Sequence, residues 1–313
     1  MTDLLIYLAF AFAVGACVGS FLNVCIARWP HEQSVVSPPS RCPNCGHGIR
    51  WHENIPIFGW LMLRGKCAGC RNPISPRYPI VELAVALVWV ACAWWLGPTF
   101  AAFRVAVLAT TLLGIALTDL EHYLIPDGFT VFGFLFLLGT SLVAAMLGEH
   151  APFATPWDAV IGACVGAGAI AIIGWLGEVA LGKEAMGLGD VTLMAMAGAA
   201  LGPVRTLLSV FVGAALASVV FVALVYPIVA IRQRRAATAG GMRGPIAAGV
   251  GGETALVTAT SGSNQSSSDV ASAEVEEAGG MPLVPFGVFL APATLVTLLW
   301  GDALVGWYLG LMR

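Results

Sequence analysis

The chain has 313 residues, of which 58% are hydrophobic and only 11% are charged. A water-soluble domain carries roughly a quarter charged residues, so this composition excludes an ordinary soluble globule. The net charge of −3 gives no support for nucleic-acid binding. The apolar residues also fall in blocks of about 20, a length typical of helices that cross a membrane.

Apolar segments along the chain predict an all-α fold, a polytopic membrane bundle of about eight spans. The segments cover residues 4–26, 80–97, 100–118, 129–147, 157–181, 190–202, 204–231 and 284–312. The first is interpreted as a retained span and not a secretory signal, because no basic residue precedes it and it runs almost to Arg28. Small residues such as Gly162 and Gly166 predict close packing between membrane helices.

Two polar segments interrupt the apolar pattern. Residues 28–79 are rich in Cys, Arg and Pro, whereas residues 232–282 are mainly Gly, Ala, Ser and Glu and are expected to be a disordered loop. These features predict five parts of the chain. They are a first transmembrane helix (1–27), a cysteine loop (28–79), a membrane core (80–231), a disordered loop (232–282) and a final membrane segment (283–313).

The basic residues predict how the chain is oriented. Segment 28–79 holds 7 of the 15 Lys and Arg residues, and four more arginines lie in segment 232–282. The positive-inside rule places both segments in the cytoplasm and the N-terminus outside. When the predicted spans are counted from there, the turns at 119–128 and 182–190 both face the cytoplasm.

Each of these turns carries an aspartate. Asp119 follows an apolar helix, and Asp190 follows Gly187-Leu-Gly189 at the start of another. Charged groups at membrane depth are costly and usually functional. Two aspartates brought together could activate a water molecule and protonate a leaving amine, which is acid–base peptide hydrolysis. The alternatives are a helix N-cap for Asp190 and an ordinary interfacial charge for Asp119. The neighbouring polar residues are expected only to flank this pair: Glu121, His122 and Asp127.

Four of the eight cysteines form two Cys-x-x-Cys pairs, Cys42 with Cys45 and Cys67 with Cys70. This spacing predicts a tetrahedral structural zinc with no open position for a catalytic water. A redox or disulfide pair is the alternative, and a cytoplasmic location weakens it. The histidines of this loop are expected to be solvated and not to act as a fifth ligand: His31, His47 and His52.

Several motifs occur in the order found in the prepilin peptidase family, also called type IV leader peptidases. The chain resembles that family in its N-terminal run, in and around its cysteine loop, in both aspartate motifs and in its last apolar segment. The matching segments are Gly19 to Pro30, Arg41 to Cys45, Glu53 to Pro56, Gly65 to Cys70, Arg77 to Glu82, the Asp119 turn, Gly187 to Asp190, and Pro285 to Ala291. Two positions depart from the family pattern, which often has lysine where this chain has Thr192 and usually has proline where it has Val288.

The resemblance implies a bacterial inner-membrane aspartyl protease of the Gly-x-Gly-Asp type, with Asp119 and Asp190 as its catalytic acids. It implies cleavage of the basic leader of type IV prepilins or type II secretion pseudopilins, after a glycine, at the cytoplasmic membrane face. It also implies methylation of the new N-terminus with S-adenosylmethionine as donor. No glycine-rich nucleotide-binding fingerprint supports this second activity independently.

Two other classes of function remain as alternatives for a membrane protein with these acids. A transporter or channel would place acids in mid-span and show inverted repeats, whereas these acids flank spans. A catalytically silent assembly factor could use the cysteine loop for docking, but it would have no need to retain both aspartates. Ser20 is not interpreted as a nucleophile because no histidine is placed to activate it.

Overall fold

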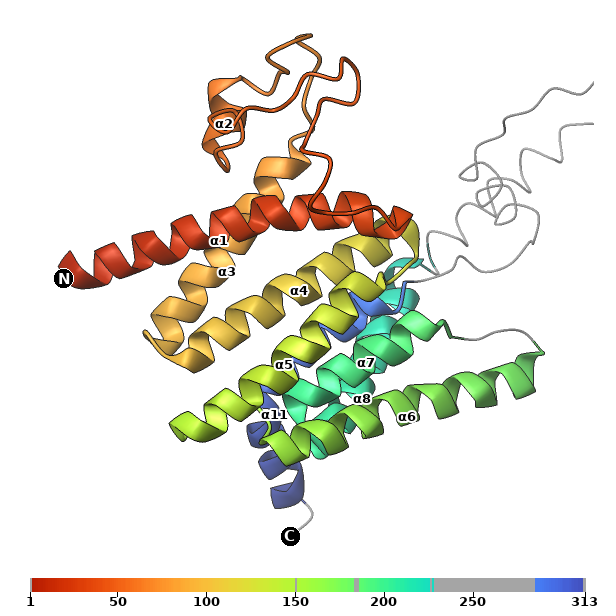
Figure 1. The fold of residues 1–313 in the computed structure, drawn as a ribbon. Coiled ribbons are helices and arrows are strands. Elements are labelled where there is room, and N and C mark those ends of the chain that lie inside the picture. Colours follow the sequence, from red (N-terminus) through yellow and green to blue (C-terminus); the bar gives the residue numbers. More distant parts are fainter. Residues whose placement is uncertain (1, 150, 183–185, 226, 228–284, 312–313) are drawn as a thin grey trace, which may run out of the picture. The chain divides into compact units, whose positions relative to one another are not determined.

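The computed structural model describes residues 2–149, 151–182, 186–225, 227 and 285–311, which form a helical protein (Figure 1). Residues Met1–Ser218 and Pro285–Arg313 form one compact unit, and Val219–Val284 form another. The helices of the first unit are α1 (Thr2–Arg28), η1 (Trp29–His31), α2 (Phe58–Met62), α3 (Arg77–Leu96), α4 (Phe100–His122), α5 (Asp127–Leu147), α6 (Pro156–Leu181), α7 (Leu188–Leu201), α8 (Pro203–Val220) and α11 (Gly287–Leu311). The short π-helix η2 (Phe221–Val225) belongs to the second unit.

Seven helices of the described residues are long and apolar enough to cross a membrane, which confirms the predicted polytopic all-α fold. The predicted span 190–202 forms α7, which has only 14 residues. A helix of that length measures about 21 Å, whereas the hydrocarbon core of a bilayer is about 30 Å thick. Among the described residues, the expectation of about eight spans therefore becomes seven helices of spanning length and one shorter apolar helix. The predicted disordered segment 232–282 and the last residues of the predicted span 204–231 lie outside the described residues.

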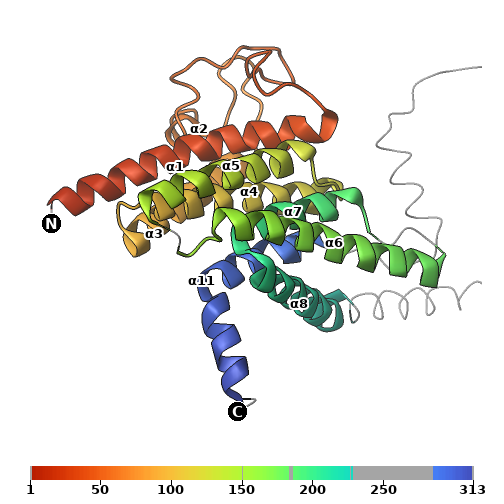
Figure 2. The ribbon, with the colours of Figure 1, turned by 60° about the horizontal axis from the view of Figure 1, so that its bottom comes forward.

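Helix α4 is the centre of the bundle. It packs against α1, α3, α5 and α11, and Figure 2 shows these helices gathered around it. Leu108, Leu112 and Ile115 on this helix are almost completely buried. Because neighbouring helices surround α4, the Asp119 side of its last turn faces the protein interior, whereas Leu120 and Glu121 in the same turn are exposed.

Helices α6 and α7 approach each other very closely. A Cβ on Gly162 would collide with the carbonyl oxygen of Gly198, and one on Gly166 would collide with that of Met194. The close packing predicted for these two glycines of α6 is therefore confirmed. The contact fixes α7 firmly beside α6, and Leu193 and Met196 of α7 are fully buried.

This contact predicts a large difference between two glycine substitutions. Gly198→Ala should lower the melting temperature, because its new methyl group meets the backbone of Gly162 and overpacking costs about 1–3 kcal/mol. Gly168→Ala in α6 is the matched control, since a Cβ there meets nothing within 4 Å. Thermal unfolding of both variants in detergent measures the effect. Equal melting temperatures would show that the two helices can separate without cost.

The ends of α6 and α7 are staggered. A Cβ on Gly174 of α6 would lie 3.3 Å from the Cβ of Met186, which precedes the N-cap residue of α7. Helix α6 continues from there to Leu181, which is about 10 Å of additional helix. The start of α7 is thus recessed relative to the end of α6 (Figure 1).

Candidate active site and metal centre

Asp119 lies in the last turn of α4. That helix ends at Tyr123, whose left-handed backbone (φ 53°) lets its N–H bond the carbonyl oxygen of Asp119. The Asp119 residue is only 5% exposed. This burial contradicts the alternative of an ordinary interfacial charge, because a buried carboxylate is costly unless polar groups meet it.

The first residues of α11 provide those polar groups. The backbone N–H of Val288 donates to Oδ2 of Asp119 over 3.2 Å, although the two residues are 169 positions apart in sequence. Free N–H groups and the helix dipole make a helix N-terminus favourable for a negative charge. A Cβ on Gly287 would lie 2.8 Å from the same Oδ2 atom, so the carboxylate can approach this closely only beside a glycine.

Asp190 lies in the first turn of α7. The N-cap residue of this helix is Gly187, so the alternative of Asp190 as the N-cap is wrong. Asp190 is half-buried. The hydroxyl of Thr192, at the position where the resemblance suggests lysine, donates to the carbonyl oxygen of Gly189 over 3.0 Å and therefore stays within its own helix.

Ile125 brings the two aspartates to one place. It belongs to the turn that follows Asp119, and it is only 7% exposed. A Cβ on Gly189 would lie 2.9 Å from Cβ of Ile125, and one on Gly287 would lie 3.0 Å from its Cδ1. The end of α4, the start of α7 and the start of α11 therefore meet around one side chain, so the helix ends that carry Asp119 and Asp190 lie next to each other.

The polar residues near Asp119 have separate partners. Glu121 forms an ion pair with Arg77, with 2.8 Å between Oε1 and Nη2, and so links α4 to the start of α3. The ring of His122 contacts His31 edge-to-face, with 5.7 Å between centroids. Asp127 is exposed in the first turn of α5. These partners do not include Asp119, and the role of the three residues as flanking groups stays a prediction.

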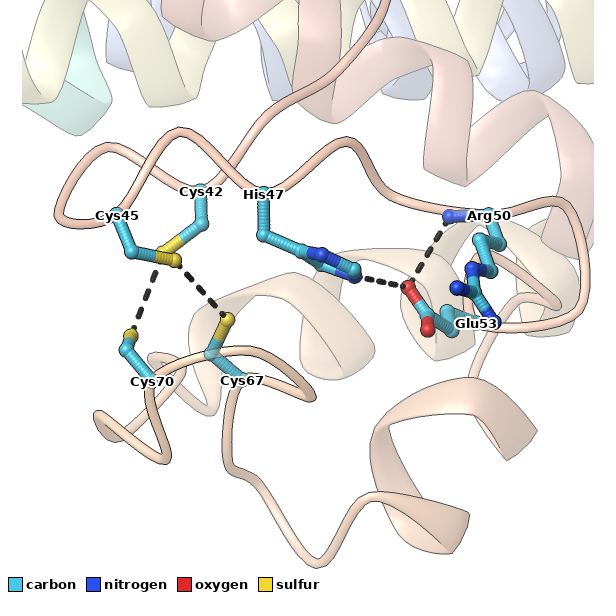
Figure 3. Close-up of polar contacts among 7 residues, drawn as sticks. All are labelled: Cys42, Cys45, His47, Arg50, Glu53, Cys67 and Cys70. Carbon is cyan, nitrogen blue, oxygen red and sulfur yellow. Dashed lines mark hydrogen bonds and ion pairs between the residues drawn. The ribbon is translucent and has the colours of Figure 1, made fainter.

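The four predicted cysteine ligands come together in the cysteine loop (Figure 3). All four Sγ atoms lie within 4.8 Å of one another. Two of the distances, Cys42 to Cys70 and Cys45 to Cys67, are 3.9 Å. A tetrahedral zinc with bonds of about 2.3 Å requires sulfur–sulfur distances of about 3.8 Å, so the cluster fits that metal.

The backbone builds the two halves of this cluster in the same way. The N–H of Cys42 bonds the carbonyl oxygen of His47, and the N–H of Cys67 bonds that of Asn72, both over 2.9 Å. The residue after each second cysteine has a positive φ, 71° at Gly46 and 62° at Arg71. Such turns direct N–H groups toward the sulfurs, and the N–H groups of Cys45 and Asn44 lower the pKa of Cys42 to about 7. At Cys45 the N–H of His47 acts in the same direction, but burial and the neighbouring cysteines outweigh it and raise that pKa to about 11. Thiolates are the form that binds metal.

His47 lies beside the cysteines but points away from them. Its Nε2 lies 3.1 Å from Oε2 of Glu53, which also accepts the N–H of Arg50 over 3.1 Å (Figure 3). The Arg50 N–H, and after it His47, lower the pKa of Glu53, so this carboxylate is ionised at neutral pH. The geometry gives His47 a carboxylate partner and no role as a fifth ligand. His31 and His52 contact other aromatic rings.

The cysteine loop is joined to the helices by a residue whose role the sequence did not indicate. Oε2 of Glu82, in α3, accepts the N–H of Ile57 over 2.7 Å. Glu82 is 8% exposed. The sequence signal for this role is an acid inside an otherwise apolar segment, since Glu82 lies within the apolar block 80–97.

The fold and the site define a multi-pass membrane protein in which the helix ends that carry two aspartates meet around one buried side chain, and in which a loop carries a four-cysteine cluster. The model described as the Bacterial Peptidase A24 N-terminal domain matches residues 13–96, and that of the Type IV leader peptidase family matches residues 106–223. The chain belongs to the type IV leader peptidase family.

Relatives named prepilin leader peptidase/N-methyltransferase support this membership. The protein of Stutzerimonas stutzeri is 34% identical over 97% of this chain and 94% of its own length. That of Pseudomonas aeruginosa is 33% identical over 95% of this chain and 91% of its own. The Myxococcus xanthus protein is 44% identical, over 62% of this chain and 56% of its own length. No solved structure matches the chain.

Proposed function

We propose that this protein is a prepilin peptidase of the bacterial inner membrane, with Asp119 and Asp190 as its catalytic acids. It removes the basic leader of type IV prepilins or type II secretion pseudopilins by cutting after a glycine. The observation that carries this proposal is the meeting of both aspartates around Ile125. Family membership and the names of the relatives support the substrate class.

Two neighbouring carboxyl groups do not both ionise easily, so one of them retains its proton. The ionised one takes a proton from a water molecule while the water oxygen attacks the carbonyl carbon of the scissile peptide. The protonated one donates its proton to the peptide nitrogen. The C–N bond then breaks, its electron pair stays on the nitrogen, and a free N-terminal amine leaves.

The two aspartates divide these roles through their surroundings. Val288 and the start of α11 stabilise negative charge on Asp119. Gly189, the residue before Asp190, contacts the same Ile125 side chain that Gly287 contacts beside Asp119, which supports a short distance between the two carboxyl groups. Asp119 is therefore the general base, and Asp190 retains the proton for the leaving amine.

The orientation of the protein belongs to the same proposal. The 7 basic residues of segment 28–79 favour a cytoplasmic cysteine loop and an N-terminus outside. A prepilin has a basic leader followed by an apolar helix held in the bilayer. Its scissile bond lies at the cytoplasmic interface, where this orientation places the end of α4 and the start of α7.

Cys42, Cys45, Cys67 and Cys70 are proposed to hold a structural zinc ion. Sulfur–sulfur distances near 3.9 Å and backbone N–H groups around the sulfurs support this assignment. With four protein ligands the ion has no open position, so it shapes the loop and does not take part in cleavage.

Replacing Cys42 with Ser is expected to reduce the zinc content of the purified protein from about one ion per chain to nearly none. The loop should then lose its fold and become sensitive to protease, because a structural zinc supplies about 10–16 kcal/mol of binding free energy. Elemental analysis and limited proteolysis measure both effects. Cys164→Ser, at an exposed cysteine of α6, is the control. Undiminished zinc in Cys42→Ser would remove the metal assignment.

N-methylation of the new N-terminus is proposed as a second activity, because the relatives carry N-methyltransferase in their names. The methyl donor would be S-adenosylmethionine.

The whole proposal is tested by co-expressing the full chain with candidate prepilins and analysing the mature N-termini by mass spectrometry. Cleavage after glycine with an added methyl group is the expected result. A prepilin that stays uncut in membranes containing the folded protein would contradict the protease assignment. Ion flux through proteoliposomes without any cleavage would instead favour a transporter.

A further inference from the structure

The side chain of Ile125 extends from the start of α7 to the carboxylate of Asp119. A Cβ on Gly189, the residue before Asp190, would lie 2.9 Å from Cβ and 3.6 Å from Cγ1 of Ile125. A Cβ on Gly287 would lie 3.0 Å from Cδ1 of Ile125 and 2.8 Å from Oδ2 of Asp119. The ethyl arm of Ile125, which runs from Cβ through Cγ1 to Cδ1, therefore occupies the space between the two helix ends that carry the aspartates.

This ethyl arm is held in place. Ile125 is only 7% exposed, and an isoleucine side chain is stiff because it branches at Cβ. The next residue is Pro126, whose ring restricts the backbone to a φ of −67° at the entry to α5. The arm therefore cannot easily turn aside to make room for a group that enters between the aspartates.

The start of α7 is accessible away from Ile125. Gly187 and Leu188 are exposed, and Asp190 is half-buried. A Cβ on Gly187 would meet its nearest listed neighbour, the backbone nitrogen of Gly189, only at 4.0 Å. A peptide substrate can therefore reach the aspartates past Gly187 and Leu188, and it then meets Ile125 on the buried side.

The proposed reaction determines where the residue before the scissile bond must lie. Asp119 activates the water that attacks the carbonyl carbon of this residue, and Asp190 protonates the nitrogen bonded to the same carbon. Because Cα is bonded to that carbon at about 1.5 Å, a side chain on it begins directly beside the two carboxyl groups. The ethyl arm of Ile125 already fills space there.

From these contacts we infer that Ile125 determines the preference for glycine before the scissile bond, because its ethyl arm occupies the space that a larger substrate side chain would need. The inference rests on the proposed peptidase function and names the residue that limits its substrates. Ile125 exchanges no proton, so it sets specificity and is not a catalytic residue. One methyl group without room in an apolar site changes the rate by about 10–200-fold.

Two exchanges of volume between enzyme and substrate test the inference in the full chain. Ile125→Val removes one carbon, Cδ1, and a prepilin with alanine in place of the glycine adds one carbon. Ile125→Ala removes three carbons, and a prepilin with valine at that position adds three. Each reconstituted variant is given the glycine, alanine and valine prepilins. The measured quantity is its cleavage rate for each altered prepilin relative to its own rate for the glycine prepilin.

Ile125→Val should raise the relative rate for the alanine prepilin by about tenfold, and Ile125→Ala should raise that for the valine prepilin by about tenfold or more. A purely structural role of Ile125 would lower all three rates by a common factor and leave the relative rates unchanged. Ile115→Val, which removes the same carbon from a fully buried isoleucine of α4, is the matched control and should keep the relative rates of the unmodified chain.

Unchanged relative rates in Ile125→Val, with the glycine prepilin still cleaved, would overturn the inference and leave the peptidase function intact. An equal change of the relative rates in Ile115→Val would overturn it too. Ile125→Val is the conservative variant and decides the question alone if Ile125→Ala fails to fold. An unmodified, folded chain that cleaves none of the three prepilins would instead contradict the proposed function, and the inference with it.

Discussion

Asp119→Asn and Asp190→Asn are each expected to abolish prepilin cleavage, lowering the rate by about a thousandfold or more. Asn has nearly the same shape as Asp, and at position 119 it still offers an oxygen to the Val288 N–H. It cannot exchange a proton with water or with the leaving amine. The rate is measured from the conversion of a co-reconstituted prepilin to its mature form.

The exposed acids provide matched controls for these two variants. Glu121→Gln and Asp127→Asn remove a charge from the same turn without touching the buried pair, and we expect them to retain cleavage within about tenfold. Full activity in Asp119→Asn or in Asp190→Asn would exclude that residue as a catalytic acid. Equal losses in all four variants would indicate a general effect of charge at this surface.

Adding one methyl group at Gly287 should also slow cleavage strongly. In Gly287→Ala the new Cβ would lie 2.8 Å from Oδ2 of Asp119 and 3.0 Å from Ile125, so the carboxylate must move. Displacement of a reacting group by about 1 Å costs about a hundredfold in rate. The loss should appear in kcat for cleavage, with zinc content unchanged.

Gly306→Ala in the same helix is the control, because a Cβ there meets nothing within 4 Å. Cleavage by Gly287→Ala at the unmodified rate would mean that Asp119 has room to move and that its contact with α11 is dispensable. A lower melting temperature in Gly287→Ala alone, without any loss of kcat, would assign Gly287 a purely structural role.

Much of the helical framework could be predicted from the sequence, because apolar length directly reports membrane helices. The predicted segment 129–147 corresponds to α5 (Asp127–Leu147), and 157–181 corresponds to α6 (Pro156–Leu181). The predicted segment 100–118 ends too early, because helix α4 continues to His122. Its end is set by the left-handed backbone of Tyr123 and not by hydropathy, so Asp119 lies inside the helix and not in the following turn.

The parts of the site that depend on distant contacts could not be read from the sequence. The Cys-x-x-Cys pairs were visible because zinc ligands have a characteristic local spacing. The contact between Val288 and Asp119 spans 169 positions, and no periodicity indicates it. The same holds for Glu82 and Ile57, which are 25 positions apart. Packing among helices decides both contacts.

The stagger between α6 and α7 affects how a hydrolytic reaction can work inside a bilayer. Asp190 sits at the start of the shorter helix, about 10 Å before the longer one ends. Gly187 and Leu188 at this step are exposed. Attacking water would therefore reach Asp190 directly from the adjacent aqueous phase, so no pore through the protein is needed.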